Sequence, residues 1–83
     1  MSQIEKLIEA IKRNPKDVPW GDIDKVLKYY GFNCRHRGGS HYNYYHPELS
    51  EILTIPRRGP VKAIYVKQAL ELIEKLKEGK SDE

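Results

Sequence analysis

Apolar residues recur at intervals of three and four over residues 2–13 and again over residues 22–30, which places each set on one face of a helix. The first set is Ile4, Leu7, Ile8 and Ile11, and the second is Ile23, Val26, Leu27 and Tyr30. Pro15 follows the first set, and the residue before a proline avoids the helical conformation. Gly31 follows the second set, at a point where a left-handed residue commonly closes a helix. The pattern therefore predicts two amphipathic helices joined by a linker over residues 15–19.

The period of the pattern changes to two at Phe32. Alternation over residues 32–37 and 41–46 predicts two strands, and the Gly38-Gly39 pair between them permits a tight reversal. Residues 52–55 are predicted to form a third, short strand after a turn. Three consecutive strands with short connections are expected to pair as an antiparallel meander.

A last apolar stripe at helical spacing predicts a helix that begins near residues 61–63. It comprises Val66, Ala69, Leu70, Ile73 and Leu76. The order helix, helix, three strands, helix predicts an α+β fold, in which the three-stranded sheet carries helices on one face only. A chain of 83 residues forms one domain. It divides into an N-terminal helix and linker over 1–21, a core over 22–77 and a frayed tail over 78–83.

The strand alternation also separates an inner from an outer face of the sheet. Phe32, Tyr42 and Tyr44 are assigned to the core. The open face is expected to carry Arg35, Arg37, His41, Asn43 and Tyr45. This is the polar side of the sheet, which the helices leave uncovered.

Charge and histidine content concentrate in the same central block. Residues 31–62 contain five Lys or Arg and two Asp or Glu, so that this block carries the whole net charge of +3, and it contains all three histidines. Such a block fits a polyanion or an acidic protein partner. The single cysteine cannot form an internal disulfide, which favours a reducing, cytoplasmic compartment. No apolar run has the length of a membrane span, and no leader peptide is recognisable, so no membrane partner is expected.

The turn from Gly38 to His41 is the clearest candidate site. Glycines let backbone N–H groups approach an anion, Ser40 adds a hydroxyl donor, and an imidazole follows at once. The unperturbed pKa of histidine, ~6.5, lets it both accept and donate a proton near neutrality. The alternative interpretation is a glycine hairpin turn followed by a surface histidine.

Other side chains around this turn suggest metal or RNA binding. Four possible metal ligands fall within thirteen residues, namely Cys34, His36, His41 and His46. The alternation separates His41 from the first two, so no zinc site is predicted. We interpret His36 as a strand residue near the core edge and His46 as a turn residue.

Four arginines either clamp phosphates or solubilise a small protein: Arg35, Arg37, Arg57 and Arg58. Tyr45 is a candidate for stacking on a base.

The ordered set of these motifs resembles a known family over about residues 22–76. The set is Gly31-Phe32, an arginine-bearing strand, Gly39-Ser40-His41, Tyr44, His46-Pro47, and Ile55-Pro56 followed by a basic loop and a helix. It resembles the HicA toxins of prokaryotic toxin–antitoxin modules. The resemblance implies a double-stranded-RNA-binding-domain-like fold, to which the N-terminal helix is an addition. It also implies an mRNA endoribonuclease that a HicB antitoxin holds inactive, with His41 as the catalytic residue. The family usually has Pro-His after the third strand, where this chain has Arg57.

The chemistry of RNA cleavage is compatible with these residues. RNA supplies its own nucleophile, the 2′-OH, so an enzyme needs proton transfer and charge stabilisation but no metal or cofactor. We expect His41 to act as general base or acid, and Gly39 and Ser40 to bind the phosphate. Arg35, Arg37, Arg57 and Arg58 are expected to offset its charge, while water or Tyr45 serves as the second proton carrier. The alternatives are an RNA-binding module without catalysis, and a protein-interaction domain whose basic face docks an acidic partner.

Overall fold

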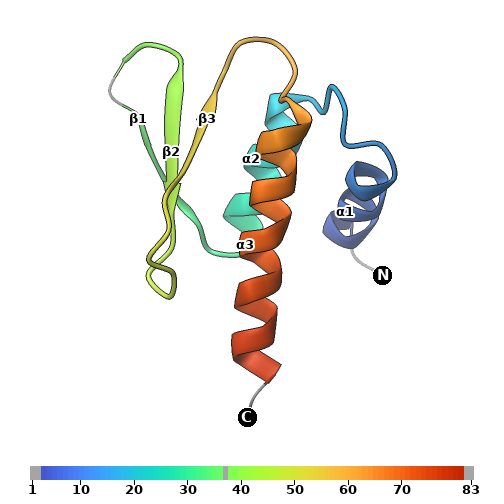
Figure 1. Ribbon diagram of the computed structural model, residues 1–83, viewed down its shortest axis with the longest axis vertical. Coiled ribbons are helices and arrows are strands. Elements are labelled where there is room, and N and C mark those ends of the chain that lie inside the picture. Colours follow the sequence, from blue (N-terminus) through green and yellow to red (C-terminus); the bar gives the residue numbers. More distant parts are fainter. Residues whose placement is uncertain (1–2, 37, 82–83) are drawn as a thin grey trace.

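The computed structural model describes residues 3–36 and 38–81, which form three helices and three strands (Figure 1). In chain order these are α1 (Gln3–Arg13), α2 (Trp20–Tyr29), β1 (Asn33–His36), β2 (His41–Tyr45), β3 (Leu53–Pro56) and α3 (Ala63–Ser81). The order of elements agrees with that expected from the periodicity of the sequence.

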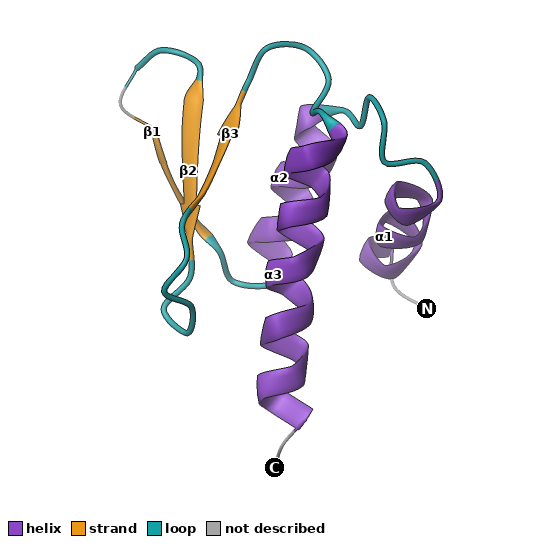
Figure 2. Cartoon of the chain, viewed as in Figure 1, coloured by secondary structure: helices purple, strands orange, loops and turns teal. Residues whose placement is uncertain are grey.

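β2 is the central strand of an antiparallel sheet, with β1 and β3 as its neighbours. In this register Arg35 lies opposite Asn43, and Asn43 lies opposite Thr54. α2 and α3 lie on one side of the sheet, and α1 lies beyond them (Figure 2). The predicted α+β fold is therefore confirmed, and the arrangement is consistent with a double-stranded-RNA-binding-domain-like fold.

The core lies between the sheet and the helices. Tyr44, Leu53 and Ile55 are buried from the strands, and Phe32 is buried just before β1. Tyr42 is half-buried and packs against this core. The assignment of Phe32, Tyr42 and Tyr44 to the inner face is thus confirmed. Helix α1 contributes a second row of buried residues, comprising Ile4, Ile8 and Ile11.

The end of α2 is fixed by a glycine in the left-handed region. Gly31 has φ +92°, a conformation that is open to glycine at little steric cost. Its N–H donates to the Lys28 carbonyl, and the N–H of Phe32 donates to the Leu27 carbonyl, both at 3.1 Å. These two bonds satisfy the last carbonyls of the helix in a Schellman arrangement, and they direct Phe32 into the core.

The linker between α1 and α2 is more firmly held than its sequence indicates. Val18 forms a β-bridge with Val61, whose N–H donates to the Val18 carbonyl at 2.7 Å. Both valines are buried. The bridge fixes the start of α3 against the linker, and it was not predicted because the two residues are far apart in the sequence.

Tyr44 links the sheet to α2 through a partly buried hydrogen bond. Its hydroxyl donates to Asp24 Oδ1 at 2.6 Å, and Asp24 Oδ2 lies 3.2 Å from Lys28 Nζ. Burial raises the pKa of Tyr44 far above its usual value, and the hydrogen bond to Asp24 raises it further. The phenol therefore keeps its proton in the folded protein at a pH where the unfolded chain has lost it.

This shift predicts a loss of stability in alkali. Above pH ~10 the unfolded state binds one proton fewer at Tyr44 than the native state, so the free energy of unfolding falls by about 1.4 kcal/mol per pH unit from this group. Tyr44→Phe is expected to remove that component, while it lowers stability at neutral pH by about 1–2 kcal/mol. Urea unfolding of the parent and of the variant between pH 8 and 11.5 measures the slope of the free energy of unfolding against pH for each protein. Equal slopes would show that Tyr44 ionises as readily in the fold as in the unfolded chain.

Candidate active site

The β1–β2 turn holds His41 at the first position of β2. Gly38 and Gly39 have φ of +80° and +72°, in the left-handed region that favours glycine. The His36 ring donates from Nε2 to the Gly39 carbonyl at 2.7 Å, which braces the turn. His41 is exposed and lies opposite Pro56 of β3. The turn therefore presents this imidazole at the end of the sheet.

The β3–α3 loop brings a second set of residues to the same place. The Arg57 N–H donates to the Ser40 carbonyl at 2.6 Å, so that the chain stays against the β1–β2 turn just beyond β3. Gly59, with φ +73°, then redirects the chain. The Lys62 carbonyl accepts the Tyr65 N–H at 3.0 Å in the first turn of α3. This path places Lys62 and Tyr65 beside the end of the sheet.

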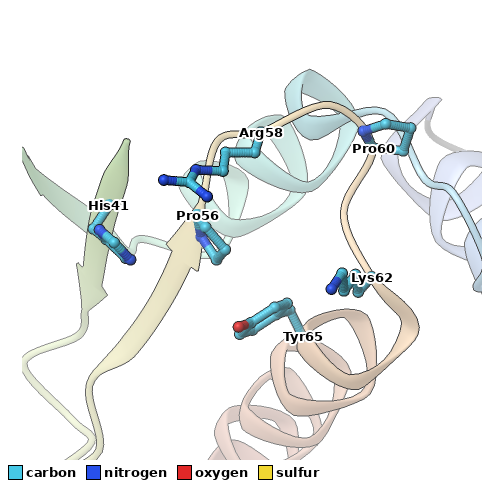
Figure 3. A pocket seen from close by; sticks show the side chains of 6 residues that line it. All are labelled: His41, Pro56, Arg58, Pro60, Lys62 and Tyr65. Atoms are coloured by element: carbon cyan, nitrogen blue, oxygen red, sulfur yellow. The ribbon is translucent and has the colours of Figure 1, made fainter. Parts of the chain in front are cut away.

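A pocket of about 260 Å³ lies between these two segments. It is lined by His41, Pro56, Arg58, Pro60, Lys62 and Tyr65 (Figure 3). Figure 3 shows Tyr65 reaching from α3 toward the strands with its hydroxyl foremost, and His41 facing the pocket from β2. Two lining residues, Arg58 and Lys62, are cationic and none is acidic. The pocket is thus suited to an anionic group such as a phosphate beside an imidazole.

Two of the residues predicted to bind RNA lie at a separate cavity on the open face. The Arg35 guanidinium carbon is 5.7 Å from the centroid of the Tyr45 ring. Both residues line a cavity of about 640 Å³, together with Asn43, whose side chain accepts a hydrogen bond from Thr54 at 2.6 Å. This cavity is therefore distinct from the His41 pocket, which is lined by residues of the β3–α3 loop and of α3.

The remaining predicted residues divide between the turn and the helix side of the sheet. Gly39 and Ser40 form the turn that precedes His41. The Arg57 guanidinium carbon lies 4.6 Å from the Trp20 ring centroid, so this side chain packs on α2. Arg37 lies outside the described residues. Arg58 is the predicted arginine that lines the pocket together with His41.

Lys62 and Tyr65 line the pocket but were not among the site residues chosen from the sequence. Lys62 is the residue before α3, and Tyr65 lies three positions further on, in the first turn of that helix, so both side chains can face the same side. Lys62 belongs to the basic central block, and this was a usable signal. Nothing local in the sequence indicates that these two residues share a pocket with His41, because that depends on the path of the β3–α3 loop.

The other two histidines have structural partners. His36 stacks on Tyr42, with ring centroids 4.0 Å apart, at the rim of the core. His46 begins the β2–β3 turn as expected, but its ring is buried and bonded on both sides. Nε2 donates to the Tyr30 carbonyl and Nδ1 accepts the Glu48 N–H, each at 3.0 Å. These bonds require the neutral Nε2–H tautomer and fix the turn to the end of α2.

Within the part of the chain that the structure describes, no three His, Cys, Asp or Glu side chains converge as ligands for a metal ion. Among the same residues, no helix combines the length and apolar character needed to cross a membrane.

The fold and the pocket define a small α+β domain with a histidine at the mouth of a cationic site. A family model described as the HicA toxin of bacterial toxin–antitoxin systems matches residues 20–75. The chain therefore belongs to the HicA toxin family. Known toxins of this family are mRNA interferases, and membership of a toxin–antitoxin family implies an antitoxin as partner. The match begins at the first residue of α2, so α1 lies outside it. Comparison with curated proteins gave no match, and comparison with solved structures gave none either.

Proposed function

We propose that this chain is the toxin of a type II toxin–antitoxin module and cleaves mRNA without a metal ion, thereby blocking translation. The observation that carries the proposal is the position of His41 in a pocket whose charged residues are both cationic, within a chain of the HicA family. His41 is the acid–base catalyst. It removes the proton from the RNA 2′-OH, which then attacks the adjacent phosphorus.

The pocket cations supply the charge stabilisation that this reaction needs. Negative charge builds on the non-bridging oxygens as the phosphorane forms, and fixed cations stabilise it more than they stabilise the starting phosphate. Arg58 and Lys62 fill this role in the pocket. The Gly39 and Ser40 turn contributes backbone and hydroxyl donors beside His41. Arg57 adds positive charge on the neighbouring side of the β3 end.

The open face of the sheet binds the RNA that flanks the cleaved bond. Single-stranded RNA is recognised by bases stacked on aromatic rings and by cations at its phosphates. Tyr45 and Arg35, which lie together at the second cavity, provide one of each; Arg37 follows in sequence. A HicB-like antitoxin covers this face and the His41 pocket in the inactive complex. We place the reaction in the cytoplasm, where mRNA is translated.

The test is incubation of the purified chain with single-stranded RNA in the presence of EDTA. The proposal expects discrete cleavage products that increase with time, and relief of cleavage when the antitoxin is added. An RNA-binding module without catalysis would shift RNA on a gel with steep salt dependence yet leave it intact. Intact RNA after long incubation, with binding preserved, would replace the nuclease proposal by that alternative.

A further inference from the structure

Cleavage of RNA by its own 2′-OH requires two proton transfers. One removes the proton of the 2′-OH, and the other delivers a proton to the 5′-oxygen as the P–O5′ bond breaks. General acid–base groups on both sides of a reaction each contribute about 10²–10⁴-fold. His41 accounts for one transfer, so the pocket needs a second group that carries a proton to the leaving oxygen.

Tyr65 is the neutral proton donor that shares the pocket with His41. It lies on α3, across the pocket from β2, and its hydroxyl is the part that reaches furthest toward the strands (Figure 3). The residue is half-buried, and the main-chain bond from its N–H to the Lys62 carbonyl holds its position in the helix. A tyrosine ring has only two rotatable side-chain bonds, so little entropy is lost when its hydroxyl is placed. Base and acid on opposite sides of a phosphate are the arrangement that an in-line displacement requires.

We infer that Tyr65 is the general acid of the reaction, a role that rests on the proposed ribonuclease function. His41 takes the proton from the 2′-OH, the 2′-oxygen forms a bond to phosphorus, and the P–O5′ electron pair leaves on the 5′-oxygen. Tyr65 donates its proton to that oxygen. The products are a 2′,3′-cyclic phosphate and a 5′-hydroxyl, and water returns the proton from His41 to Tyr65.

The other residues near the site are poorer donors for this step. Tyr45 lies at the separate cavity with Arg35, so it does not reach the bond beside His41. A guanidinium group is too weak an acid to give up a proton to the leaving oxygen, which excludes Arg58. Lys62 would lose its positive charge at the moment when negative charge on the phosphorane is greatest. A phenol donates its proton while both pocket cations remain charged, which keeps the electrostatic stabilisation intact.

Substitution of sulfur at the leaving position separates a general acid from a phosphate-binding residue. A linkage that the parent protein cleaves is first mapped, and the same RNA is then made with sulfur in place of the 5′-oxygen at that linkage. A thiolate leaves without protonation, so the reaction of this substrate has no need of a general acid. Tyr65→Phe is expected to slow cleavage of the oxygen linkage by about 10²-fold and that of the sulfur linkage by less than about threefold, whereas His41→Ala slows both, because both reactions need the 2′-OH proton removed.

Two further variants serve as matched controls. Tyr29→Phe makes the same change at an exposed tyrosine outside the pocket and should leave both rates unaltered. Lys62→Met should slow both linkages alike, as expected for a cation that stabilises the phosphorane. Thermal unfolding of Tyr65→Phe verifies that the fold is kept.

Each remaining outcome has a definite meaning. If Tyr65→Phe slows both linkages equally, Tyr65 binds the phosphate and the general-acid assignment is wrong. If this variant cleaves both linkages at the parent rate, the residue has no part in the reaction. If sulfur instead rescues Lys62→Met, the lysine is the acid. If the parent protein cleaves neither RNA, the ribonuclease function itself fails, and that result is distinct from the other three.

Discussion

Replacing His41 with alanine is expected to lower the rate of RNA cleavage by about 10³–10⁴-fold. The ring is exposed at the start of β2 and is absent from the core, so its loss should change the free energy of unfolding by less than about 0.5 kcal/mol. Catalysis and stability are therefore separable at this position. Single-turnover cleavage of a labelled RNA measures the first, and urea unfolding measures the second.

Added imidazole distinguishes the loss of a catalytic ring from a structural defect, because it can replace the ring but cannot repair the fold. The alanine variant leaves space beside the pocket, and free imidazole that enters it should restore part of the rate in proportion to its concentration. His36→Ala is the comparison substitution, because His36 is also exposed in the same hairpin but bonds to the Gly39 carbonyl of the turn and does not line the pocket. It should retain cleavage within an order of magnitude. Parent-like cleavage by His41→Ala would show that another group is the catalyst.

The part of the site that could be predicted from the sequence is the part that depends on local rules. Alternation over β1 and β2 set which residues share a face, so His41 could be separated from His36 without coordinates. The Gly38-Gly39 pair predicted the chain reversal between β1 and β2, which is directly followed by His41. Arg58 belonged to a basic loop directly after the third strand, close enough in sequence to be associated with the turn.

Contacts between distant segments could not be obtained in this way. Tyr65 and His41 line the same pocket because the Arg57 N–H donates to the Ser40 carbonyl and because Val61 pairs with Val18. Each contact fixes part of the β3–α3 loop, and neither has a signal in the local sequence. The same loop path turns the Arg57 side chain onto α2, although the sequence places it beside Arg58.

The surroundings of His46 likewise depend on contacts between distant segments, which could not be predicted from the sequence. A histidine before a proline is typical of a turn, and the ring could equally well have been in solvent. Instead it lies against Phe32, with ring centroids 5.2 Å apart, and next to Gly31, where an added Cβ would lie 3.1 Å from Nε2. A side chain larger than glycine at position 31 would therefore meet the ring. The left-handed end of α2 and the buried imidazole are thus fitted to each other.

His46→Ala is accordingly expected to lower the free energy of unfolding by about 2–4 kcal/mol, since it removes two hydrogen bonds and a buried ring. For a domain of this size that corresponds to a fall in Tm of about 10–20 °C, which thermal unfolding by circular dichroism measures. His46→Asn is the informative comparison. Its side-chain oxygen can still accept the N–H of Glu48, two residues on, but its amide is too short to reach Tyr30. Asparagine should therefore recover part of the loss, whereas an alanine variant within about 0.5 kcal/mol of the parent would mean that the ring does not join the turn to α2.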